Sequence, residues 1–265
     1  MADEPAFPRH PNAVGPDDAF YVGWQPVMPA PFVALVRPVV IALALLLALG
    51  GAALATQATR GQPGVFEFGQ LREYEGVLYE RPVPALRVPA PGGEGAVNLL
   101  LVGFGKFGLP PQARGHHGER VRFRGTVISQ GGVTMIEISD ADSFTAFGEA
   151  TRGEQRPPPV ELGEVTLVGE LVDTKCYLGV MRPGFGKVHR GCATRCLSGG
   201  VPPGLLVRHG GDYGTVILLA GPGGAPLEFD PRWAGLPVRV VGALQSHEGT
   251  PALLVSEMTL AEGGA

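Results

Sequence analysis

Three cysteines and one histidine lie close together in this 265-residue chain: Cys176, His189, Cys192 and Cys196. The three cysteines are all that the chain contains. Thiolate sulfur and imidazole nitrogen are ligands that zinc, iron–sulfur clusters and copper(I) prefer, and three thiols with one imidazole form a tetrahedral zinc set. We therefore predict that these four residues bind a cofactor, either zinc or an iron–sulfur cluster.

The spacing of the last three residues suggests how they are held. His189, Cys192 and Cys196 stand at positions i, i+3 and i+7, so in a helix they point from one face. Gly191 weakens such a helix. Cys176 is expected at the end of the preceding strand, separated from the helix by a Pro-Gly loop.

Two other interpretations of the same residues remain open. Outside the cytoplasm, two of the cysteines could form a disulfide that only stabilises the fold. Alternatively, Cys192 and Cys196 could be a redox-active pair, because basic neighbours and a helix start lower a thiol pKa.

Five basic residues accompany the cysteines, with Asp173 as the acidic residue nearby. We predict that they dock an acidic partner or an anionic ligand, although an ordinary solvated surface explains them equally well. They are Lys175, Arg182, Lys187, Arg190 and Arg195.

Other functional classes have little support in the sequence. Gly103, Gly105 and Gly108 match a dinucleotide-binding GxGxxG pattern, but prolines follow instead of a helix, so we expect these glycines to form turns. A net charge of −4 without a basic groove argues against nucleic-acid binding. Since neither a Ser/His/Asp set nor a paired-acid motif stands out, we lean toward a protein that is not an enzyme.

An internal repeat organises the rest of the chain. Residues 118–139 resemble residues 235–256 at one constant offset, with seven identities including Gly125 with Gly242. Upstream, Gly76 aligns with Gly169. The second copy is 24 residues longer, which is about the length of the Cys/His segment, so we interpret residues 174–200 as an insertion.

Short segments of alternating β-branched residues between Gly-rich turns predict an all-β protein. Each copy offers five strands, which resembles the small barrel of the OB-fold; a small β-sandwich is the alternative. We predict OB-like barrels at residues 66–146 and 163–260, joined by a linker at 147–162. The expected strands are 73–80, 84–88, 97–103, 120–129 and 133–139 in the first copy, and 164–173, 204–208, 214–220, 237–246 and 251–258 in the second.

An apolar segment precedes the barrels. Residues 38–55 contain no charged side chain and, as a helix, are about 27 Å long, which is close to the thickness of the bilayer core. We predict a transmembrane helix at 32–58 after a disordered cytoplasmic tail at 1–31. A signal peptide fits less well, because the region before the apolar run is long and acidic. The protein is thus expected to be a single-pass inner-membrane protein with periplasmic barrels.

One membrane helix followed by an OB-like barrel resembles the haem chaperone of cytochrome c maturation. That family uses a histidine followed by a tyrosine, whereas His247 here is followed by Glu248. The resemblance therefore implies the architecture but not haem delivery.

These observations predict an accessory or electron-transfer subunit of a membrane redox system, with a protein partner in the same membrane complex. The alternatives are a thiol-disulfide oxidoreductase that uses Cys192 and Cys196, and an assembly scaffold whose cysteines only form a disulfide.

Overall fold

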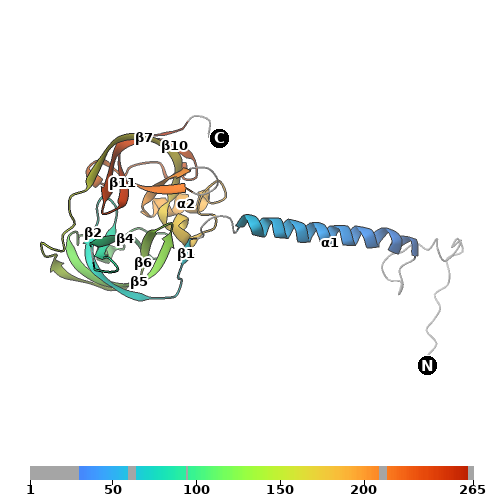
Figure 1. Ribbon diagram of the computed structural model, residues 1–265, viewed down its shortest axis with the longest axis horizontal. Coiled ribbons are helices and arrows are strands. Elements are labelled where there is room, and N and C mark those ends of the chain that lie inside the picture. Colours follow the sequence, from blue (N-terminus) through green and yellow to red (C-terminus); the bar gives the residue numbers. More distant parts are fainter. Residues whose placement is uncertain (1–29, 59–63, 94, 209–213, 262–265) are drawn as a thin grey trace, which may run out of the picture. The chain divides into compact units, whose positions relative to one another are not determined.

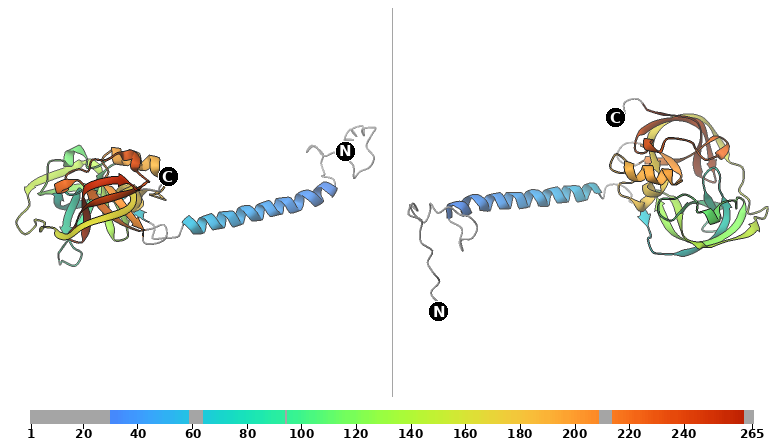
Figure 2. Two further views of the ribbon diagram at one scale, coloured as in Figure 1. Left: turned by 90° about the horizontal axis from the view of Figure 1, so that it is seen from above. Right: turned by 180° about the vertical axis from the view of Figure 1, so that it is seen from behind.

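The computed structural model describes residues 30–58, 64–93, 95–208 and 214–261 (Figures 1 and 2). The chain divides into two compact units, Met1–Arg60 and Gly61–Ala265. The tail predicted at 1–31 falls almost wholly outside the described residues.

The first unit contains one long helix, α1 (Ala30–Ala58). Its apolar stretch Phe32–Thr56 has 25 residues and exposes its side chains. At 1.5 Å per residue it is about 37 Å long, which exceeds the roughly 30 Å bilayer core. By length and composition, α1 is able to cross a membrane.

The second unit begins with a closed five-stranded barrel. Its strands are β2 (Arg72–Tyr79), β3 (Ala85–Pro89), β4 (Ala96–Gly103), β5 (Glu119–Gln130) and β6 (Val133–Glu149). The order β5-β2-β3-β4-β6 closes through β5–β6; β4 and β6 pair in parallel, and the other neighbours are antiparallel. The short β1 (Val65–Phe66) adds to β5, and a 3₁₀ turn, η1 (Pro111–Ala113), precedes β5.

A second barrel repeats this topology. It comprises β7 (Val160–Asp173), β8 (Pro203–Arg208), β9 (Gly214–Ala220), β10 (Pro237–His247) and β11 (Thr250–Leu260). The strands close in the order β10-β11-β9-β8-β7, and β9 pairs in parallel with β11 as β4 does with β6. Two 3₁₀ turns, η3 (Pro222–Gly224) and η4 (Pro231–Trp233), lie between β9 and β10. The prediction of two tandem OB-like barrels after an apolar helix is confirmed.

The repeated glycines mark places where strand backbones approach closely. A Cβ atom on Gly76 would lie 2.4 Å from the Arg87 carbonyl oxygen, and one on Gly169 would lie 2.6 Å from that of Leu206. A Cβ atom on Gly242 would likewise lie 2.1 Å from the Leu254 carbonyl oxygen. A side chain at these positions would push apart the neighbouring strand, so the repeat conserves backbone contacts that each barrel needs.

The two barrels share an apolar core. One buried cluster joins Leu100 and Ile128 of the first barrel to Val172 and Leu206 of the second, and it includes Cys176 and Cys196. A bidentate ion pair between Arg87 and Glu248 also links them, with its closest approach at 2.7 Å. The cysteine segment therefore folds against both barrels.

Candidate metal centre

The inserted segment follows β7 directly. Cys176 begins η2 (Cys176–Val180), a single π-helical turn, and its backbone N–H donates to Asp173 Oδ1 at 2.8 Å. After a loop, α2 (Arg190–Ser198) carries Cys192 and Cys196, so the predicted helix is present and His189 is its N-cap residue. Gly191 lies in the first turn, where a side chain would meet open space.

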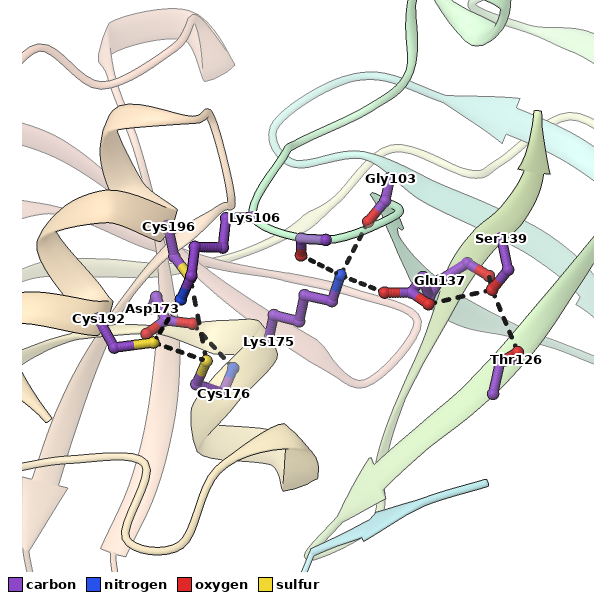
Figure 3. Close-up of polar contacts among 11 residues, drawn as sticks. Gly103, Lys106, Thr126, Glu137, Ser139, Asp173, Lys175, Cys176, Cys192 and Cys196 are labelled. Carbon is purple, nitrogen blue, oxygen red and sulfur yellow. Dashed lines mark hydrogen bonds and ion pairs between the residues drawn. The ribbon is translucent and has the colours of Figure 1, made fainter. Parts of the chain in front are cut away.

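All three thiols converge (Figure 3). Cys176 Sγ lies 4.0 Å from Cys192 Sγ and 3.9 Å from Cys196 Sγ, and the three sulfur atoms all lie within 4.8 Å of one another. Sulfurs bound to one tetrahedral zinc ion at about 2.3 Å are about 3.8 Å apart. A disulfide requires about 2.05 Å. The arrangement thus matches one shared ion, and the three cysteines are free thiols.

The thiols differ in environment. Cys176 and Cys196 are buried, whereas Cys192 is half-buried. The hydrogen bond with Cys196, followed by burial, raises the pKa of Cys176, while the hydrogen bond from Cys176 lowers the pKa of Cys196. The two neighbouring thiols therefore differ in acidity, and Cys196 is the more acidic of the pair.

Sequence reasoning missed Lys106, which reaches the site from the first barrel. Its Nζ lies 2.7 Å from Cys192 Sγ and 4.0 Å from Cys196 Sγ. The hydrogen bond with Cys192 raises the pKa of Lys106, so the side chain is an ammonium. Three thiolates around one divalent ion would carry a net charge of −1, which this ammonium would balance. Lys106 lies within the glycine-rich loop 103–108. Its contact joins residues that are far apart in the sequence, so no local pattern predicts it.

The structure places His189 beside a carboxylate rather than in one group with all the thiols. His189 Nε2 lies 2.9 Å from Asp173 Oδ2, and both side chains are buried. Ligand atoms of Asp173, Cys176 and His189 form a second group within 4.8 Å, which shares Cys176 with the thiol group. Among the described residues, no group holds all four predicted ligands. The Asp173–His189 pair resembles the outer-shell carboxylate–histidine partners that orient metal ligands.

Lys175 does not belong to the predicted docking set, because its side chain is buried. It is 1% exposed and forms a short ion pair with Glu137, which is also buried. Its Nζ also donates to the carbonyls of Gly103 and Gly105, at 2.8 and 2.6 Å. A buried ammonium must be paired, so this lysine fastens the 103–108 loop to the cysteine segment and is unavailable to a partner.

The other four predicted docking residues lie on the exposed surface. Arg182 donates to the Gly64 carbonyl, and Arg190 donates to that of Arg232. Lys187 and Arg195 complete the set.

Comparisons with known proteins leave the family open. No family model and no curated protein matches the chain. Among solved structures, it is similar to a deletion mutant of the single-stranded DNA-binding protein from Thermus aquaticus, with 11% identity and a TM-score of 0.21. That match covers 76% of this chain and 88% of the other. The TM-score is too low to support a conclusion, and the fold assignment rests on the strand pairing.

Proposed function

We propose that this protein is a membrane-anchored accessory or electron-transfer subunit of a redox system, in which Cys176, Cys192 and Cys196 bind one metal ion. The observation that supports the proposal is the convergence of three sulfur atoms: Cys176 Sγ lies 3.9 and 4.0 Å from the other two, and all three lie within 4.8 Å of one another. The half-buried Cys192 places one edge of the site near solvent, where a partner has access.

Zinc is the first choice of ion. Thiolates that share one ion lie close together, as these do, whereas the cysteines of a four-iron cluster bind separate irons and stand farther apart. Clusters of this kind usually take four cysteines, and the chain has three. The geometry therefore favours a single zinc ion over the iron–sulfur cluster that the sequence left open. Because zinc has no redox chemistry, this choice of ion favours the accessory role over electron transfer.

The membrane assignment depends on α1. Its 25-residue apolar stretch is long enough to anchor the protein, and the acidic residues before it disfavour cleavage as a signal sequence. We place the barrels in the periplasm, attached to the inner membrane. There Arg182, Lys187, Arg190 and Arg195 form a basic surface for an acidic protein partner in the same membrane complex.

Metal analysis of the full chain, purified in detergent under reducing conditions, tests the proposal. We expect one zinc per chain, and cobalt(II) substitution should give the intense near-ultraviolet absorption of thiolate-to-metal charge transfer. Cys176→Ser should lose both signals, while Ser198→Ala on the exposed end of α2 should keep them.

Two results would contradict the proposal. A metal-free reduced protein that regains no ion from added zinc argues against a metal centre. A native disulfide in protein purified without a reductant would instead support the thiol-disulfide oxidoreductase or the scaffold.

A further inference from the structure

We propose that Lys106 and Cys192 are a modification site, at which dioxygen joins the lysine nitrogen to the cysteine sulfur through one oxygen atom. The product is a nitrogen–oxygen–sulfur bridge between the two barrels. This proposal uses a thiol of the proposed metal centre but does not require that a metal binds there.

The separation of the two atoms is the first argument. Lys106 Nζ lies 2.7 Å from Cys192 Sγ. A usual N–H···O hydrogen bond measures about 2.9 Å, and sulfur is larger than oxygen, so this contact is short for a hydrogen bond to sulfur. A single oxygen atom bonded to both atoms spans about this distance. By contrast, the Cys176 and Cys192 sulfurs must move from 4.0 Å to about 2.05 Å to form a disulfide.

The two groups are also held in place by separate anchors. Lys175 binds the carbonyls of Gly103 and Gly105 on the N-terminal side of Lys106, and Gly108 N–H donates to the Gly199 carbonyl at 3.0 Å on the other side. Cys192 lies within α2. Fixing two reactants at near-contact distance raises their effective concentration by orders of magnitude.

Access selects Cys192 among the three thiols. Cys192 is half-buried beside the exposed Lys106, whereas Cys176 and Cys196 are buried. Oxidation favours the thiol that is accessible, and Cys192 is also the thiol nearest to the lysine nitrogen. The same contact therefore supplies both the reactive sulfur and the nitrogen that captures it.

The reaction balances with dioxygen as the only oxidant. The ammonium, the thiolate and one dioxygen molecule give the bridge and one water. The dioxygen bond and two N–H bonds break, an N–O and an O–S bond form, and two protons leave with the second oxygen atom as water. Four electrons pass to dioxygen, so two molecules of a dithiol reductant restore the amine and the thiol.

Intact-mass spectrometry of the full chain tests the proposal. The protein is purified in detergent, stripped of metal by a chelator, reduced, and then exposed to air. A bridge raises the mass by about 14 Da, a disulfide lowers it by about 2 Da, and a sulfenic acid raises it by about 16 Da. We expect the gain of about 14 Da, reversed by dithiothreitol, with peptides containing Lys106 and Cys192 joined after proteolysis.

Two conservative variants sharpen the test. Lys106→Arg keeps the positive charge but has no amine to bridge, so the mass gain should disappear. Lys187→Arg, on an exposed lysine of the insertion, should leave the gain unchanged. The proposal is overturned if air-treated wild type shows another mass change or none, or if the gain persists in Lys106→Arg. Zinc content of the reduced protein is measured separately, so failure of the bridge and failure of the metal centre are distinguishable.

Discussion

At the scale of single residues, one buried carboxylate organises the thiol site. Asp173 accepts the backbone N–H of Cys176 through Oδ1 and contacts His189 through Oδ2, so it fixes both the first cysteine and the start of α2. Its side chain has no solvent exposure. Through these two contacts Asp173 positions Cys176 and His189, with which it forms the second candidate group of ligand atoms.

Asp173→Asn should weaken zinc binding by about 10- to 100-fold, as loss of outer-shell partners generally does. The amide keeps one acceptor oxygen but replaces the other with a donor, which leaves one of the two contacts unmet. Zinc affinity is measured by competition with a coloured chelator. Glu164→Gln, on an exposed position of the same strand, is the matched control. Equal affinities in the two variants would refute the positioning role.

The buried His247 should make the stability of the protein depend on pH. It is 7% exposed, and burial, followed by the charge of Arg156, lowers its pKa to about 4. The Gln245 amide nitrogen lies 3.0 Å from His247 Nε2. An amide nitrogen donates, so the ring accepts and is neutral. The unfolded chain takes up a proton near pH 6.5, while the folded chain does not until about pH 4.

The free energy of unfolding should therefore fall as the pH drops from about 6.5 to 4, by at most about 1.4 kcal/mol per pH unit from this group. Urea unfolding of the reduced, metal-free protein measures the slope. His247→Gln should flatten it, whereas His10→Gln, before α1, should not. An unchanged slope in His247→Gln would contradict the assignment.

At the scale of elements, the 103–108 loop and α2 meet through glycines. A Cβ on Gly199 would lie 1.9 Å from the Lys106 carbonyl oxygen, and one on Gly108 would lie 2.1 Å from that of Gly200. Gly199 has a φ of −84°, which any residue adopts, so close packing alone requires glycine there. The end of α2 thus sets where Lys106 lies.

Gly199→Ala should push the loop away and separate Lys106 from Cys192. We expect the air-dependent mass gain to fall several-fold and the protein to lose about 1–3 kcal/mol of stability through overpacking. Gly191→Ala, in the same helix but facing open space, should keep the mass gain and stabilise the helix by about 0.5–1 kcal/mol. A normal mass gain in Gly199→Ala would show that the loop is not set by α2.

The strands and the helix α2 could be predicted because the sequence patterns that indicate them lie within each segment. In β5, buried Val121 and Phe123 alternate with exposed Arg122 and Arg124, and this period of two fixes the strand without knowledge of its neighbours. The convergence of the thiols followed from spacing within one segment. Lys106 and Glu137 were missed because their contacts join residues that are 86 and 38 positions apart, respectively, across the two barrels. Lys175 was misjudged for the same reason, since its buried partner lies in the other copy of the repeat.

At the scale of the whole molecule, the barrels are joined by a shared core and two ion pairs, Arg87–Glu248 and Lys175–Glu137. We therefore expect both barrels to unfold in one calorimetric transition. Glu248→Gln should lower the free energy of unfolding by about 1–3 kcal/mol, because it leaves Arg87 without its charged partner. The single transition should move to lower temperature as a whole. Glu75→Gln, in an exposed pair within the first barrel, should cost less than about 0.5 kcal/mol. Two separate transitions in the wild type would refute this coupling.

The meeting of Lys106 with three sulfurs from the other barrel has a consequence for biogenesis. During synthesis the N-terminal half emerges first with the cation and none of the sulfurs, and neither half alone can complete the arrangement. The arrangement therefore forms only after both barrels have been synthesised and have packed against each other.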